Sequence, residues 1–290
     1  MHARSVLRII ALASTLAGCA NLQENISVAE QGKPEGGAMA AMAQQRKGES
    51  AEASEQGNAE DGLLRLASDI EAHGQREAAL PIYQRAVSLS GGTPDSYVRL
   101  GDACLRAGRF KDASEAYRAS LAKAPDNAEA LLGVGSVMVR QGRPEAALET
   151  LSKAAPLLNT AVAYDRLGVA QTLAGQLPQA RASFGTAVQL APDDLDIRTN
   201  QALAAALADD GEAALTTMRE IAHSPVAEAR HRRDFVVVLG MTGHPAEAES
   251  DTALGDLSKK EVRGLLARAS SIRSLSDPKA RAKALGAIAG

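Results

Sequence analysis

Small residues recur at a spacing of about 34 residues along most of the chain. Each unit has glycine or alanine at its eighth position, alanine at its twentieth, and a large residue four positions later. The five clearest units start at Glu60, Pro94, Ala128, Ala161 and Leu195. Two antiparallel helices approach closely only where both carry small side chains, and the large residue then fills the gap to the next unit. This period predicts an all-α solenoid, a class of fold that presents an extended binding surface.

Turn-forming residues fall where such helices should end. Position 15 of four units is a glycine, which can close the first helix in a left-handed conformation. These glycines are Gly74, Gly108, Gly142 and Gly175. Pro125 and Pro192 should stop two of the second helices, and the Asp126-Asn127 and Asp193-Asp194 pairs behind them can cap the next helices. Thr93-Pro94 supplies a cap and a first-turn proline for the second unit.

A few residues depart from the repeat. We expect Pro81 in the first turn of its helix, where a missing N–H costs little, and we expect Pro156 to end its helix early. Asp209 stands where the turn glycine of the fifth unit belongs, and the sixth unit, residues 229–256, is irregular. Such departures predict a stack that weakens toward a terminal capping unit.

The small and large positions with their turn glycines, in register over residues 60–228, resemble the tetratricopeptide repeat (TPR). The resemblance implies a superhelical TPR solenoid of about five to six helix-turn-helix repeats over residues 60–256. Ser258-Lys259-Lys260-Glu261 fits a capping box, so we expect a C-terminal capping helix and tail over residues 257–290. Residues 277–290 should form a weak terminal helix or fray.

The amino-terminal residues differ from the repeats. Arg4 and Arg8 precede an apolar run from Ile9 to Gly18, and the first acidic residue is Glu24. This pattern is typical of a bacterial export signal, and the apolar run is too short to span a bilayer. We therefore expect a lipoprotein signal peptide over residues 1–18.

The apolar run ends in Leu16-Ala17-Gly18-Cys19, which resembles the lipobox of bacterial lipoproteins. The resemblance implies cleavage before Cys19 and a covalent lipid anchor on it, and Ala20 implies sorting to the outer membrane. Residues 19–59 are rich in small and polar residues, so we expect the lipidated cysteine and a disordered tether there, with the solenoid facing the periplasm. The alternative is an ordinary secretory signal with a chance cysteine.

Charge and aromatic content argue against several ligand classes. The formal net charge is −3, so nucleic acid is not expected as a partner. All four tyrosines and three phenylalanines fall on framework positions of the repeat, which leaves none to stack on sugars or bases. We expect no cofactor, no metal site and no small-molecule substrate.

Residues that could carry chemistry have structural interpretations. The sequence has no H-E-x-x-H, G-x-S-x-G or P-loop motif. Ser120 and Lys123 match the S-x-x-K of penicillin-binding enzymes, but Ser120 occupies a small packing position of its unit. Cys104 falls at a core-facing position, where an inert thiol is expected. Arg230-His231-Arg232-Arg233 should form a solvated face, with a contact to anionic headgroups or an acidic partner as the alternative. The chain is therefore not expected to be an enzyme.

The remaining candidate site is the concave face, which the first helix of each unit lines in TPRs. The residues at its usual contact positions, expected to form a partner-binding groove, are Val98, Asp102, Leu105, Arg106, Leu132, Ser136, Val139, Arg140, Asp165 and Val169. They make an apolar strip edged by Arg106 and Arg140, which suits a helix or an extended peptide with apolar anchors and an acidic group. The lysines and asparagines of the carboxylate clamp of chaperone-binding TPRs are absent. Packing between units is the alternative role for any one of these residues.

The lipobox, the low-complexity tether and the TPRs together resemble the TadD-type lipoproteins of the tight-adherence (Tad/Flp) pilus system. The resemblance implies a non-catalytic outer-membrane scaffold whose protein partner is the secretin or another pilus assembly component. It would aid secretin assembly or localisation in a type IV-like pilus secretion system. The alternatives are a pilotin-like factor of another envelope machine and a periplasmic lipoprotein that recruits or regulates peptidoglycan enzymes.

Overall fold

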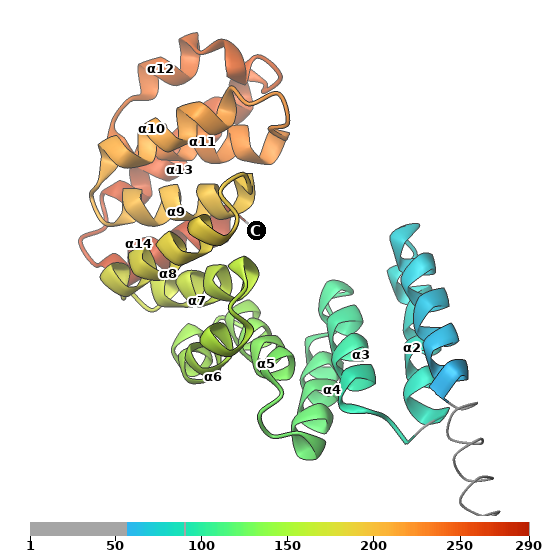
Figure 1. Cartoon of the computed structure of the whole chain (residues 1–290). Coiled ribbons are helices and arrows are strands. Elements are labelled where there is room, and N and C mark those ends of the chain that lie inside the picture. The colour runs from blue at the N-terminus through green and yellow to red at the C-terminus, as the bar shows by residue number, and fades with distance from the viewer. Residues whose placement is uncertain (1–56, 90, 290) are drawn as a thin grey trace, which may run out of the picture. The chain divides into compact units, whose positions relative to one another are not determined.

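The computed structural model describes residues 57–89 and 91–289, and every regular element in them is helical. A helix over residues 57–72 comes first. The helices that follow are α2 (Arg76–Leu89), α3 (Pro94–Arg106), α4 (Phe110–Lys123), α5 (Ala128–Arg140), α6 (Pro144–Leu158), α7 (Ala161–Leu173), α8 (Leu177–Leu190), α9 (Leu195–Leu207), α10 (Gly211–Ala222), α11 (Ala229–Thr242), α12 (Pro245–Ser250), the 3₁₀ helix η1 (Thr252–Leu254), α13 (Lys259–Arg273) and α14 (Pro278–Ala289) (Figure 1). The expected signal peptide, Cys19 and most of the tether lie outside the described residues.

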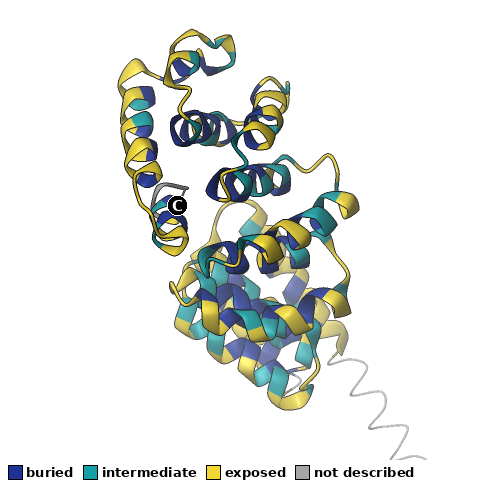
Figure 2. Cartoon of the chain, turned by 90° about the vertical axis from the view of Figure 1, so that its left-hand side faces the viewer, coloured by how far each residue is buried: buried dark blue, intermediate teal, exposed yellow. Residues whose placement is uncertain are grey.

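Neighbouring helices pack as pairs, and each pair packs on the next. α3 lies on α4, α5 on α6, α7 on α8 and α9 on α10, while α4 also contacts α5 and α6 contacts α7. The first helices of successive units contact one another as well, in the order α3, α5, α7, α9 and α11. Buried residues occupy the facing sides of these helices and exposed residues the outward sides (Figure 2). The predicted all-α stack of helix pairs is confirmed.

Glycines at the eighth position of a unit make room for the large residue of the same unit. A Cβ atom on Gly101 would lie 2.6 Å from the ring of Tyr117, and one on Gly168 would lie 2.8 Å from the ring of Phe184. The same atom on Gly135 would lie 2.5 Å from Leu151. Real Cβ atoms do not approach other atoms so closely, so only glycine fits these helix crossings. The steric logic that the repeat predicts is therefore what holds the pairs together.

The turn within each unit uses a left-handed residue, as predicted. Gly74, Gly108, Gly142 and Gly175 have φ values of 80°, 75°, 71° and 78°. Asp209, which replaces the turn glycine of the fifth unit, keeps the same conformation at φ 60°. The backbone thus repeats even where the residue type does not, at the cost that a left-handed conformation imposes on a side chain with a Cβ atom.

The predicted helix caps are confirmed for three helices and half confirmed for a fourth. The Thr93 side chain accepts from the Ser96 N–H at 3.1 Å, and Asn127 and Asp194 cap α5 and α9 in the same way. The Ser258 hydroxyl accepts from the Glu261 N–H at 3.2 Å. Among the described contacts, however, the Glu261 carboxylate does not complete the capping box.

Both internal prolines are placed differently from the prediction. Pro81 is the sixth residue of α2, not a first-turn residue, because α2 begins at Arg76 directly after the Gly74–Gln75 turn. Pro156 does not end α6 early, since the helix continues to Leu158 and closes at Asn159 in a left-handed conformation. Pro156 has no N–H to bond the carbonyl four residues earlier, and the helix ends only two residues after it.

The sixth unit is shortened, and two further helices follow it. Its second helix, α12, has 6 residues and is continued by η1, so α13 takes the place of a longer partner and packs along α11. Of the hydrophobic cores in the described residues, the one here is the largest, and it contains the buried run from Phe235 to Leu239. These contacts match the expectation of an atypical terminal unit covered by a capping helix.

α14 returns along the stack to contact α7 and α9. Arg281 lies 8% exposed and its Nη2 donates to Asp209 Oδ1 at 2.8 Å, while Lys279 forms an ion pair with Glu145 at the start of α6. In the described range, none of the helices combines the length and the apolarity that a bilayer crossing requires.

Candidate binding groove

Six of the ten predicted groove residues line one cavity of about 350 Å³. They come from the first helices α3, α5 and α7, and they are Leu105, Arg106, Ser136, Val139, Arg140 and Val169. Arg76 at the start of α2 and Arg166 of α7 complete the lining. We call this cavity the arginine groove. Its volume is within the range of about 300–1,000 Å³ that binding pockets usually have.

The other four predicted residues hold the stack together instead of lining this cavity. Val98 is 4% exposed and belongs to the core of the first units, and Leu132 packs against the core around α6 and α7. Asp102 accepts a hydrogen bond from the Tyr117 hydroxyl at 2.5 Å, and Asp165 accepts one from Asn200 Nδ2 at 2.8 Å. For these residues the packing interpretation is the better one.

Arg106 is the most constrained of the four arginines in the groove. Its guanidinium binds both carboxylate oxygens of Glu71, with Nη2 at 2.8 Å from Oε2, and the Tyr83 hydroxyl donates to the same Oε2 at 3.2 Å. The bond from Arg106 holds the pKa of Glu71 below its usual value. This contact ties the first unit to the second and leaves Arg106 with little charge for a ligand.

The other three arginines of the groove make no direct ion pair among the described residues, although Arg76 acts at longer range on Glu71 and Arg166 on Asp165. No carboxylate forms an ion pair with Arg76, Arg140 or Arg166 there. Arg140 lies with its guanidinium carbon 5.7 Å from the centre of the Phe110 ring, which orients the side chain without neutralising it. The groove therefore has a positive lining, although the whole chain has a net charge of −3.

Sequence reasoning missed Arg76 and Arg166. Neither lies at a position from which TPR first helices usually contact a ligand, and Arg76 belongs to a second helix. Only the three-dimensional packing of α2, α3, α5 and α7 brings them beside Arg140.

The residues that could have carried chemistry are engaged in packing. Cys104 is 2% exposed, and burial raises the pKa of its thiol to about 11, so the reactive thiolate is scarce at neutral pH. Ser120 is fully buried and Lys123 is exposed, so the apparent S-x-x-K motif does not bring the two groups together. Within residues 57–89 and 91–289, no group of three or more His, Cys, Asp or Glu residues could hold a metal ion.

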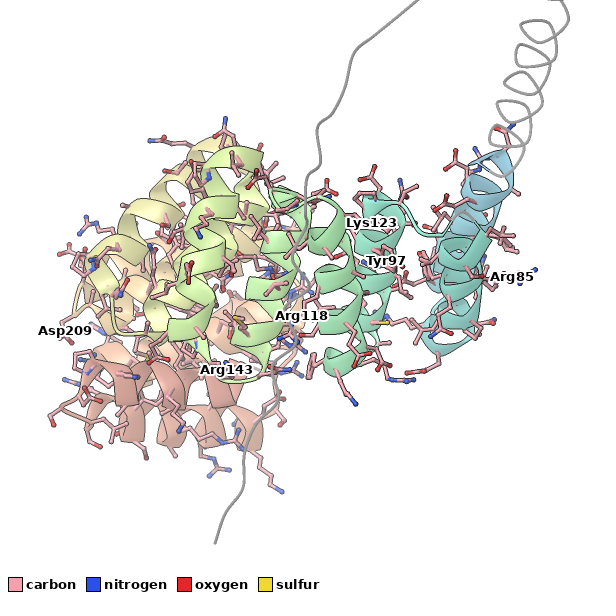
Figure 3. All side chains as sticks on the ribbon, turned by 90° about the horizontal axis from the view of Figure 1, so that it is seen from below. Arg85, Tyr97, Arg118, Lys123, Arg143 and Asp209 are labelled. Atoms are coloured by element: carbon pink, nitrogen blue, oxygen red, sulfur yellow. The ribbon has the colours of Figure 1, made fainter. Side chains whose placement is uncertain are left out.

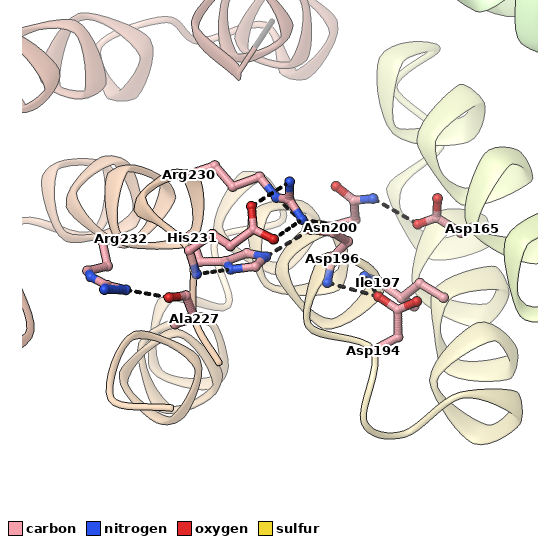
Figure 4. Close-up of polar contacts among 10 residues, drawn as sticks. Asp165, Asp194, Asp196, Ile197, Asn200, Ala227, Arg230, His231 and Arg232 are labelled. Atoms are coloured by element: carbon pink, nitrogen blue, oxygen red, sulfur yellow. Dashed lines mark hydrogen bonds and ion pairs between the residues drawn. The ribbon is translucent and has the colours of Figure 1, made fainter. Parts of the chain in front are cut away.

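The basic cluster at residues 230–233 is not a uniformly solvated face. His231 is 3% exposed, and its Nε2 lies 2.8 Å from Asp196 Oδ1 across the α9–α11 interface (Figure 4). Arg230 binds the same carboxylate at 3.0 Å, and Arg233 binds Glu261 at 2.6 Å. The predicted solvated face holds for Arg230 and Arg233, which are exposed, and is wrong for His231, because acidic residues of α9 and α13 face the cluster and join α11 to its neighbours.

Comparison with known proteins gives the class of the chain. The family model described as "Tetratricopeptide repeat" matches residues 64–120, 98–165 and 174–228, which together make up more than half of the chain. The chain belongs to the tetratricopeptide repeat family, whose members act as scaffolds for interactions between proteins.

Solved structures with the same fold include pilus proteins. PilW, described as a widely conserved type IV pilus biogenesis factor, is 17% identical with a TM-score of 0.62, covering 72% of this chain and 98% of its own. The Pseudomonas aeruginosa pilF protein is 18% identical with a TM-score of 0.56, covering 69% of this chain and 97% of its own. At these identities the likeness establishes the fold alone.

Two curated proteins match the repeats over part of their length. The CTR9 homolog of Arabidopsis thaliana is 32% identical over 121 residues, which are 41% of this chain and 11% of that protein. Cellulose synthase operon protein C of Pseudomonas fluorescens (strain SBW25) is 25% identical over 141 residues, which are 46% of this chain and 11% of that protein. The chain thus spans about a tenth of the length of these relatives.

Proposed function

We propose that this TPR protein is a non-catalytic outer-membrane scaffold that binds a pilus assembly component, in the first place the secretin, through the arginine groove. The observation that carries the proposal is the groove itself, where apolar side chains of α3, α5 and α7 share one lining with four arginines, of which only Arg106 makes an ion pair among the described residues. Apolar anchors fix a bound segment and charged groups orient it, which is how TPR-like surfaces recognise peptides.

The assignment to a Tad/Flp pilus rests on the sequence around the solenoid. The TadD-like arrangement of lipobox, tether and repeats supports it, and the fold shared with PilW and pilF is compatible with it. Deletion of the gene should abolish secretin multimers and surface pili together. Intact multimers and pili in the deletion strain would refute the assignment, and a partner set dominated by wall hydrolases would favour the peptidoglycan alternative instead.

The location at the outer membrane has its own test. A lipid on Cys19 would anchor the chain and leave the solenoid in the periplasm, and no other anchor is part of the proposal. Cys19→Ser should release the protein from membranes, whereas Cys104→Ser, which changes a buried thiol, should leave fractionation unchanged. If the Cys19 variant still sediments with the outer membrane, the lipid anchor is refuted.

A further inference from the structure

The arginine groove carries more cations than the stability of its helices explains. Arg106 and Arg140 lie in the last turns of α3 and α5, where a positive side chain interacts favourably with the helix dipole. Arg76 is the first residue of α2, where the dipole disfavours a cation, and Arg166 lies in the interior of α7. These like charges repel one another across the cavity; Glu71 offsets the charge of Arg106 by a direct ion pair, and a bound anion would offset the others.

Three of the four arginines keep their hydrogen-bond donors for a ligand. Arg106 is occupied by Glu71, but Arg76, Arg140 and Arg166 make no ion pair among the described residues. No aspartate or glutamate lines the cavity. A planar guanidinium binds a carboxylate through two parallel hydrogen bonds, so each of the three can hold one carboxylate in a fixed orientation.

The apolar residues that line the cavity favour an apolar side chain beside the carboxylates of the ligand. Leu105, Val139 and Val169 are all half-buried and line the same cavity as the arginines. An apolar side chain seated on them would exclude water and strengthen the neighbouring charge-assisted bonds. Single-stranded nucleic acid is usually bound by stacking on aromatic side chains, and no aromatic residue is among those that line this cavity.

We propose that the arginine groove recognises an acidic segment of a partner protein, in which two or more aspartate or glutamate residues flank an apolar side chain. The proposal rests on the proposed function and narrows it, because it gives the chemistry of the segment that the scaffold binds. Arg140 and Arg166 contact the carboxylates directly, and Arg76 holds another at the α2 end of the groove.

A random-peptide phage library, selected on the full chain in mild detergent, tests the proposal. The selected peptides should be enriched in Asp and Glu around an apolar residue. Their synthetic, labelled forms should lose at least about tenfold in affinity for the Arg140→Gln/Arg166→Gln variant, since a single charge-assisted hydrogen bond is already worth about that much. Arg118→Gln is the matched control, since Arg118 is an exposed arginine of the outer helix α4 (Figure 3) and should leave affinity unchanged.

Other outcomes separate the failure of this inference from the failure of the proposed function. Peptides that carry no acidic residues, yet lose affinity for Val169→Gln, would overturn the acidic specificity while the groove remains a binding site. A selection that yields no groove-dependent peptide would contradict both. Binding of the chain to phosphatidylglycerol vesicles through Arg140 and Arg166, without binding of acidic peptides, would replace the protein segment by a lipid. Unchanged far-UV circular dichroism must show that each variant is folded.

Discussion

Arg281 and Asp209 form an ion pair across 72 residues of sequence, with Nη2 2.8 Å from Oδ1 and Nη1 3.2 Å from Oδ2. Asp209 (Figure 3) occupies the left-handed turn between α9 and α10, and Arg281 lies on α14. A residue that the repeat pattern marks as a defect in the turn is therefore the anchor of the C-terminal helix. The left-handed conformation of Asp209 costs some backbone strain, and in return its carboxylate pairs with the buried guanidinium of Arg281.

This pair predicts that the repeat's usual glycine would not stabilise the protein. Asp209→Gly relaxes the turn but leaves the buried Arg281 without its carboxylate partner. Asp209→Asn keeps a residue that tolerates the left-handed turn but removes the negative charge. We expect both variants to lose about 1–2 kcal/mol in the free energy of unfolding, measured by urea denaturation. A glycine variant more stable than the wild type would show that backbone strain outweighs the pair.

The same pair gives a pH dependence. The bond from Arg281 lowers the pKa of Asp209 below its ordinary value of 3.8. A carboxyl with a lowered pKa contributes stability that is complete above that ordinary value and is lost as the pH falls through the folded-state pKa. The difference in unfolding free energy between wild type and Asp209→Asn should therefore be constant near pH 7 and shrink below about pH 4.

Asp234 on α11 should make the stability depend on pH in the opposite direction. Burial, with a smaller contribution from the negative charge of Asp196, raises the pKa of its carboxyl to about 6, and the nearby His231, Arg230 and Arg233 only partly oppose that rise. The folded state holds this proton more tightly than the unfolded one, so the group destabilises the protein as the pH rises toward 7. Asp234→Asn should raise the free energy of unfolding by about 1–3 kcal/mol at pH 7.5 and change it little at pH 4. A loss of stability at pH 7.5 would mean that the charged form is held by favourable contacts.

Alanine substitutions at two helical glycines separate the effect of packing on stability from the effect of helix propensity. Gly168→Ala would place a Cβ atom 2.8 Å from the Phe184 ring and should cost about 1–3 kcal/mol through overpacking. Gly185→Ala, on α8, has nothing within 4 Å of the added Cβ and should gain about 0.5–1 kcal/mol. Thermal and urea melts of the two variants should move in opposite directions. Equal shifts would contradict the steric account of the helix pairs.

Removal of the ion pair between Arg106 and Glu71 should increase the affinity of the groove for acidic peptides. Glu71→Gln removes the charge that occupies Arg106, so a fourth arginine becomes available in the groove. Affinity for the acidic peptides selected above should rise about two- to fivefold, as expected for a partly exposed ion pair. Glu77→Gln is the control, because Glu77 pairs with Arg109 outside the groove at 3.6 Å. An unchanged affinity in Glu71→Gln would exclude Arg106 from the ligand contacts.

The repeat itself could be predicted because each unit solves the same packing problem. Gly101 and Tyr117, or Gly168 and Phe184, meet within one unit, so their spacing is visible in the sequence. The start of α2 was harder to predict from the sequence, because it depends on where the turn after Gly74 closes. Pro81 was therefore predicted several residues too close to the start of its helix.

Contacts between distant units produce no regular spacing in the sequence. Nothing periodic relates Arg281 to Asp209, or Arg76 to Arg166, because α14 and the arginine groove each combine residues from units far apart in the chain. The apolar part of the groove was predicted from positions 9 and 12 of the first helices. Its charge was predicted only in part, since Arg106 is neutralised by Glu71 and two further arginines replace it.

Site-specific photo-crosslinking in cells tests most directly whether the groove holds the assembly partner. A photoreactive phenylalanine at Val139 lies in the groove, and one at Arg118 lies on the outer helix α4. If the groove holds the secretin, position 139 should give a secretin-containing adduct and position 118 should give none. An adduct from position 118 alone, or none from position 139 in cells that assemble pili, would contradict it.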